Sequence, residues 1–195
     1  MSFPRWGSIP RPVTLFFARA LAFFLAWKIL YLLWLLPTRV LDEPLTRLVG
    51  VSTAAMLNLP AADGAYTVRK AFDSQSVDGG VVSGYVMDIY YNGQRTLRIA
   101  DACNGLELMV LYAAFLFCYP GRPIRRLLFL FAGIGMIYVL NVIRCSLLIR
   151  IYLYNRRYLD FSHHFVFTIV VYSFIFLLWY FYTRDRGKRK VVLPA

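Results

Sequence analysis

The sequence has few acidic residues, very few histidines and no dithiol motif. Its 195 residues include 10 Asp and Glu against 22 Lys and Arg, with only 2 His and 3 Cys. The three cysteines form no Cys-x-x-Cys pair, which argues against a redox motif. No internal repeat or low-complexity segment stands out. What the chain has in excess is apolar sequence, since 59% of its residues are hydrophobic, a share that soluble domains of this length rarely reach.

Long apolar runs indicate an integral membrane protein. Three of them have the roughly 17–25 residues that cross the hydrocarbon: residues 13–36, 127–148 and 165–182. A fourth run, 103–119, reaches spanning length only if its helix starts near Asp101. The first run is too long and charged too early for a cleaved signal peptide. The sequence therefore predicts one integral membrane domain, residues 1–195, built as a membrane all-α bundle of about four transmembrane helices with an extracytoplasmic segment at 37–102.

The basic residues concentrate in short segments between the apolar runs, and this arrangement predicts the orientation in the membrane. Ten of them fall in three segments, opposed only by Asp185: Arg5, Arg11, Arg122, Arg125, Arg126, Arg184, Arg186, Lys188, Arg189 and Lys190. Such clusters mark the cytoplasmic side, so both termini are expected inside and residues 37–102 outside. The net charge of +12 therefore reflects membrane orientation rather than nucleic-acid binding, which would gather the bases on one folded surface.

Residues 45–59 offer an alternative topology. As a fifth span, this segment would move the basic loop at 122–126 and the basic tail to the outside, against the charge pattern. Its apolar residues instead suit an amphipathic helix at the outer membrane interface: Leu45, Leu48, Val49, Met56 and Leu57.

The remainder of the outer segment, residues 62–102, is expected to form β structure. Residues 86–91 have strand-like composition, and Asn92-Gly93 is a strong two-residue hairpin signal because both positions tolerate positive φ. A small hairpin is therefore expected to lead directly into Asp101-Ala-Cys103. It serves either as a cap over the helix bundle or as one wall of a peptide-binding cleft.

Cys103 lies where the hairpin turns into the second apolar helix. Two capping schemes fit the sequence: Asn104 as N-cap with Glu107 at N3, or Asp101 as N-cap with Cys103 in the first turn. In both schemes the thiol lies beside a helix N-terminus, where the dipole and the free N–H groups favour the nucleophilic thiolate. The alternative is a buried structural cysteine, which is common in apolar chains.

Arg144 lies about one turn from the outer end of the third apolar helix, three residues after Asn141 and on the same face. It either snorkels to the interface as a structural residue or lines a site, where a guanidinium can stabilise an oxyanion or hold a carboxylate. Glu107 is the only acid within the predicted spans. It either caps its helix or pairs with Arg144.

The only histidines, His163 and His164, precede the last apolar helix on the outer side. A histidine there can accept and return a proton near neutral pH. Together with Cys103 the pair could form a metal site, but the usual ligand spacing on one helix face is absent. Nothing in the sequence demands a metal ion or an organic cofactor.

Together these motifs resemble the exosortase/archaeosortase family of membrane-embedded cysteine transpeptidases, and in particular its short, four-span bacterial members. The resemblance covers roughly residues 85–182. It rests on Ala102-Cys103-Asn104-Gly105-Leu-Glu107, Asn141-Val-Ile-Arg144 and His163, in that order. The catalytic residues that it implies are Cys103, Arg144 and His163, with Asn104, Glu107, Asn141 and His164 in support. The segment that follows favours His163 over its neighbour as the catalytic histidine.

The resemblance implies a reaction at the outer face of the bacterial cytoplasmic (inner) membrane, among membrane lipids. Substrates would be secreted proteins that end in a short motif, a hydrophobic helix and a basic tail. Cys103 would form a thioacyl-enzyme and pass the acyl group to a glycolipid, lipid or peptide amine, or to water. His163 would act as base and then acid, while Arg144 would stabilise the oxyanion or orient the thiolate.

Two other function classes remain open. A four-span thiol oxidoreductase would use Cys103 with Cys145 as its redox pair. A non-enzymatic membrane scaffold, in an export or polysaccharide-assembly system, would use Cys103, Arg144 and His163 for packing and snorkelling alone.

Overall fold

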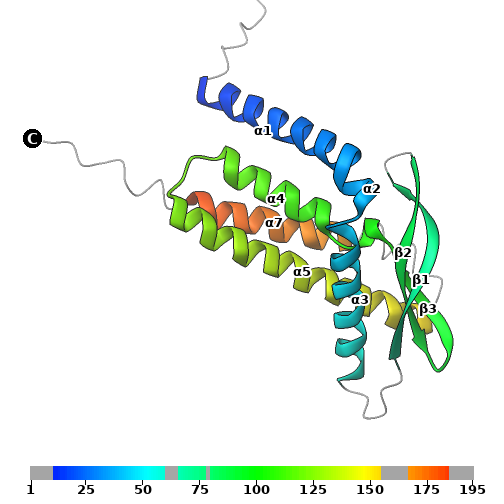
Figure 1. The fold of residues 1–195 in the computed structure, drawn as a ribbon. Helices are drawn as coiled ribbons and strands as arrows, with labels where there is room; N and C mark the ends of the chain where they lie inside the picture. The colour runs from blue at the N-terminus through cyan, green and yellow to red at the C-terminus, as the bar shows by residue number, and fades with distance from the viewer. Residues whose placement is uncertain (1–10, 60–65, 78–79, 155–166, 185–195) are drawn as a thin grey trace, which may run out of the picture.

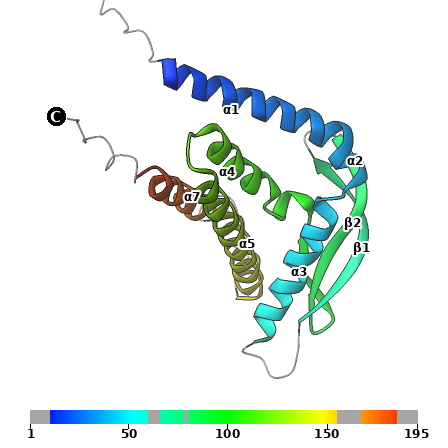
Figure 2. The ribbon, with the colours of Figure 1, turned by 60° about the vertical axis from the view of Figure 1, so that its left-hand side comes forward.

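The computed structural model describes residues 11–59, 66–77, 80–154 and 167–184. Its elements in chain order are α1 (Arg11–Leu30), η1 (Tyr31–Leu35), α2 (Leu36–Thr38), α3 (Asp42–Asn58), β1 (Tyr66–Val77), β2 (Gly80–Tyr91), β3 (Gln94–Ile99), η2 (Asp101–Cys103), α4 (Leu106–Cys118), α5 (Pro123–Tyr154) and α7 (Phe167–Arg184). Helices α4, α5 and α7 lie side by side, with α1 along α4. Helix α3 crosses the bundle at one end, and the sheet lies beyond it (Figures 1 and 2).

Two helices of the described ranges are long and apolar enough to cross a membrane, Val13–Thr38 and Pro123–Tyr154. The predicted count of four spans is therefore not confirmed. Helix α4 has 13 residues and rises about 20 Å, less than the roughly 30 Å of the hydrocarbon core. It is short because Gly105, at φ 86°, leaves the helical region, so the helix begins at Leu106 and not near Asp101. The apolar part of α7, Ile169–Arg184, is also shorter than a full span.

The bundle is held by small-residue contacts and stacked rings between α4, α5 and α7. Gly133 of α5 allows the ring of Tyr112 to approach so closely that a Cβ at position 133 would lie 2.0 Å from it. The Tyr112 hydroxyl then donates a hydrogen bond to the carbonyl oxygen of Phe129 at 2.8 Å. Phe115 of α4 stacks on Trp179 of α7, with ring centroids 4.2 Å apart. These contacts join three helices whose outer faces stay apolar.

The predicted hairpin is confirmed, and the structure adds a third strand. The three strands are antiparallel in the order β1-β2-β3. Asn92 and Gly93 form the turn between β2 and β3 with φ of 49° and 81°, as their tolerance of positive φ predicts. The chain passes from β3 through Ala100 directly into the single turn of η2, which ends at Cys103.

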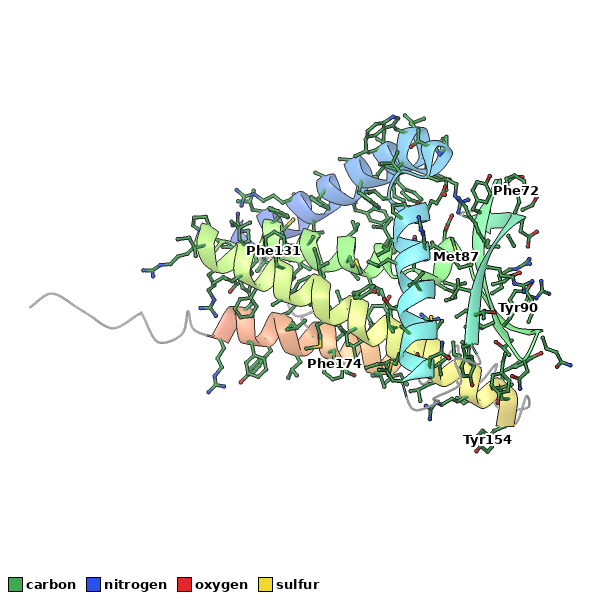
Figure 3. The ribbon with its side chains drawn as sticks, turned by 60° about the horizontal axis from the view of Figure 1, so that its bottom comes forward. Phe72, Met87, Tyr90, Phe131, Tyr154 and Phe174 are labelled. Carbon is green, nitrogen blue, oxygen red and sulfur yellow. The ribbon has the colours of Figure 1, made fainter. Side chains whose placement is uncertain are left out.

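The predicted amphipathic helix is α3, but its apolar face packs against protein. Val49 and Leu57 are buried in a cluster with residues of the sheet and of α5, while Leu48 remains exposed. Met87 of β2 lies between the sheet and α3 (Figure 3). The approach is close, because a Cβ at Gly50 would lie 2.9 Å from the Cβ of Met87. Helix α3 therefore fastens the sheet to the end of the bundle.

Candidate active site

The centre of the candidate site is a short turn, residues 101–105, which we call the cysteine turn. The backbone N–H of Cys103 donates to the carbonyl oxygen of Ala100 at 2.9 Å, and that of Asn104 donates to Asp101 at 3.1 Å. Gly105 then reverses the chain into α4 at positive φ. Cys103 is a free, half-buried cysteine three residues before the first residue of α4. Its thiol therefore lies at the junction of the sheet and the bundle.

Asn104 ties the cysteine turn to α4 and to α3 at once. Its side-chain oxygen accepts a hydrogen bond from the backbone N–H of Leu106 at 2.8 Å, so it caps the helix although Gly105 is the boundary residue. Its amide nitrogen donates to the Asp42 carboxylate at 2.9 Å and lies 3.4 Å from the Thr46 hydroxyl. Asn104 is 1% exposed, so these contacts replace water completely.

Asp101 belongs to a buried ion pair rather than to a helix cap. Its carboxylate accepts hydrogen bonds from Nε of Arg39 at 3.1 Å and from Nη2 at 2.7 and 2.5 Å. The Thr46 hydroxyl donates to the same carboxylate at 2.9 Å. Both charged partners are almost completely buried. The second capping scheme drawn from the sequence, with Asp101 as N-cap, is therefore wrong.

Helix α5 closes the other side of the cysteine turn. The side-chain amide of Asn141 donates to the carbonyl oxygen of Cys103 at 2.8 Å. Arg144 is half-buried and lies three residues further along the same helix face. Cys145 is 2% exposed in the cluster against which Cys103 packs. The structure thus brings Asn104 and Asn141 onto the turn that carries Cys103, with Arg144 one helical turn beyond.

Glu107 lies at the rim of the bundle. Its side chain is 76% exposed, and one carboxylate oxygen lies 3.7 Å from Nζ of Lys28 on α1. A pair this exposed contributes little to stability. Its contact with Lys28 links the first turn of α4 to the end of α1.

His163 and His164 lie outside the described residues, between α5 and α7. Their position relative to Cys103 stays a prediction from the sequence.

The residues that sequence reasoning missed are the ones that hold the cysteine turn in place. Arg39, Asp42 and Thr46 follow the first apolar run, 55 to 62 positions before their partners, and no local pattern links them to the turn. One cation and two carboxylates meet in this buried group. Burial raises the pKa of the Asp42 carboxyl above its ordinary value, opposed mainly by the hydrogen bond from Asn104.

The geometry suits nucleophilic chemistry. A free thiol lies on a turn that is fixed from two sides, ahead of a helix N-terminus. Asn141 of α5 contacts this turn, and Arg144 follows Asn141 by one helical turn. The described residues contain no group of three or more His, Cys, Asp or Glu that could hold a metal ion.

Comparison with known proteins gives one result. The family model described as transmembrane exosortase matches residues 6–181, which is most of the chain and includes the cysteine turn, Asn141 and Arg144. No curated protein and no solved structure matches.

Proposed function

Because the chain belongs to the transmembrane exosortase family, we propose that it is a membrane-embedded cysteine transpeptidase that cleaves C-terminal sorting signals of secreted proteins. The observation that carries the proposal is the half-buried, free thiol of Cys103. The backbone carbonyl of this residue accepts a hydrogen bond from Asn141, and Arg144 lies one helical turn beyond Asn141. Substrates are proteins that end in a short motif, an apolar helix and a basic tail. Such a helix packs beside the bundle and presents its motif at the level of Cys103.

Each proposed catalytic residue has one chemical task. The Cys103 thiolate attacks the scissile carbonyl carbon, and Arg144 donates N–H groups to the developing oxyanion. His163 takes the thiol proton and returns it to the leaving amine as the C–N bond breaks. The amine of a glycolipid, lipid or peptide acceptor, or water, then attacks the thioester carbonyl carbon. The C–S bond breaks, the thiolate is released, and His163 takes the proton that the attacking group loses.

The proposed site faces away from the cytoplasm. Arg122 lies in the α4–α5 connection, and Arg125 and Arg126 lie in the first turn of α5. This basic segment is at the opposite end of α4 from the cysteine turn and the sheet (Figure 1). Basic loops stay on the cytoplasmic side, which supports an inner-membrane protein with the thiol at the outer surface.

The direct test is processing of a tripartite C-terminal tail co-expressed with wild type, Cys103→Ala and Cys145→Ala. We expect wild type and Cys145→Ala to shorten the tail and Cys103→Ala to leave it intact, a loss of at least about 1000-fold because the nucleophile is removed. Wild type should also yield a hydroxylamine-sensitive adduct.

Equal processing by wild type and Cys103→Ala contradicts the proposal and favours a scaffold. Loss of processing in both cysteine variants means that the reaction needs both thiols, which contradicts a mechanism with Cys103 as its only cysteine. The Cys145→Ala variant is a matched control, since both cysteines belong to one packed cluster but only Cys103 is partly exposed.

A further inference from the structure

Arg39 joins three parts of the molecule through one guanidinium. It follows the last residue of α2, where the first apolar segment ends, and adopts φ 53° and ψ 23°, which turns the chain toward α3. Nη2 donates to the carbonyl oxygen of Tyr85 in β2 at 2.8 Å and to the Asp101 carboxylate at 2.5 and 2.7 Å. The side chain is 6% exposed. The end of the first apolar segment, the central strand and the cysteine turn therefore share one charge-assisted contact.

The central strand leaves room for this side chain at a single position. A Cβ at Gly84 would lie 1.6 Å from Nη1 and 2.4 Å from Cζ of Arg39. Any side chain at position 84 therefore displaces the guanidinium from Asp101. Gly84 is not at positive φ, so the need for glycine here comes from the arginine and not from the backbone.

Few bonds separate the Arg39 contact from the thiol, and hydrogen bonds hold the turn between them. Asp101 is the first residue of the single turn that ends at Cys103, and its carbonyl oxygen accepts the backbone N–H of Asn104. The Thr46 hydroxyl of α3 contacts both the Asp101 carboxylate and the Asn104 side-chain amide, so one side chain links two residues of the cysteine turn. A shift of Asp101 therefore moves the whole cysteine turn.

We propose that Arg39 is a positioning residue that holds the cysteine turn, and so the sulfur of Cys103, through Asp101. Buried ion pairs contribute little net stability compared with apolar residues of the same size, so stability alone does not account for placing one here. A misplacement of about 1 Å at a reacting centre can cost about 100-fold in rate. The role of Cys103 as nucleophile rests on the proposed function, whereas the role of Arg39 in ordering the turn does not.

The test is amide hydrogen exchange of the full-length protein in detergent micelles, read by mass spectrometry on peptides that cover residues 100–106. We expect Arg39→Lys and Gly84→Ala to speed exchange there at least about tenfold, since each loosens the Arg39–Asp101 contact. Exchange in α7 should stay within about twofold of wild type. Unchanged exchange at 100–106 in both folded variants overturns the proposal.

A neutral pair of variants decides the question if the charged site does not tolerate substitution. Thr46 and Thr53 are both buried on α3, but of the two only Thr46 donates a hydrogen bond to Asp101. Thr46→Val should speed exchange at 100–106, and Thr53→Val should not. Equal exchange in these two variants also overturns the proposal.

Turnover adds a readout that a merely structural residue would not give. With the tripartite tail as substrate, Thr46→Val and Arg39→Lys should lower kcat about 10–100-fold and leave KM within about threefold, because the substrate helix still binds. A rise in KM with kcat unchanged contradicts positioning. If wild type processes no tail, the proposed function fails and the exchange result alone decides the role of Arg39.

Discussion

Asp42 has a buried carboxyl group whose environment favours the protonated form. Its side chain is 1% exposed, and one of its oxygens accepts a hydrogen bond from the Asn104 amide. Burial raises the pKa of this carboxyl, and the nearby Asp101 carboxylate adds to the rise. The folded protein therefore binds the proton of Asp42 more tightly than the unfolded chain does.

This predicts a stability change with pH that one substitution removes. The contribution of Asp42 is fully present below its ordinary pKa and is lost as the pH rises through the raised one. Asp42→Asn keeps an acceptor for Asn104 but cannot ionise. Its Tm relative to wild type should therefore increase from acid toward neutral pH, by about 2–4 °C for each kcal/mol involved. Thermal unfolding in micelles across this pH range measures it, and parallel curves would show that Asp42 does not titrate.

At the scale of elements, the contact between α4 and α5 depends on which glycine faces the neighbouring helix. Gly133 and Gly135 lie two residues apart in α5. A Cβ at Gly133 would collide with the Tyr112 ring at 2.0 Å, whereas a Cβ at Gly135 would meet nothing within 4 Å. The two positions therefore separate helix packing from helix propensity.

The matched substitutions should have opposite signs. Gly133→Ala overpacks the contact with Tyr112 and should cost about 1–3 kcal/mol. Gly135→Ala removes backbone freedom at an open position and should stabilise by about 0.5–1 kcal/mol. Denaturation of both variants in the same detergent compares them directly. Equal changes in the free energy of unfolding would mean that Tyr112 of α4 does not pack against Gly133 of α5.

Local signals in the sequence predicted which helices and strands form better than they predicted the residues at which these elements begin and end. The hairpin followed from Asn92-Gly93 because turn chemistry acts within four residues. The predicted count of four spans is not confirmed, in part because Gly105 ends the helical path toward Asp101 and shortens α4. The sequence places Asn141 and Arg144 on one helix face, whereas the hydrogen bond from Asn141 to the carbonyl oxygen of Cys103 is known only from the structure.

The support behind Cys103 could not be predicted in the same way. Arg39 and Asp101 are 62 positions apart, and only the packing of α3 against the sheet brings them together. A charged residue next to an apolar run could pair with many residues of opposite charge, and the sequence does not identify which one the fold brings close. The catalytic role of His163 remains a prediction.

At the scale of the whole molecule, orientation can be tested with two exposed positions at opposite ends. Phe72 on β1 is 68% exposed, and Ile124 at the start of α5 is 74% exposed. In a Cys103→Ala background, Phe72→Cys should react with an impermeant maleimide in intact cells. Ile124→Cys should react only after permeabilisation, because the proposed topology places the basic loop in the cytoplasm. The reverse pattern would place the sheet inside.

The short length of α4 has a consequence for the proposed chemistry. If its cytoplasmic end sits at the membrane surface, about 20 Å of helix in a roughly 30 Å layer leaves its other end below the opposite headgroups. This hydrophobic mismatch means that the bilayer thins around the bundle or that the thioester forms in a water-poor layer. Where water is scarce, hydrolysis slows relative to aminolysis. An amine carried on a lipid would then be the favoured acceptor, because it is concentrated at that depth.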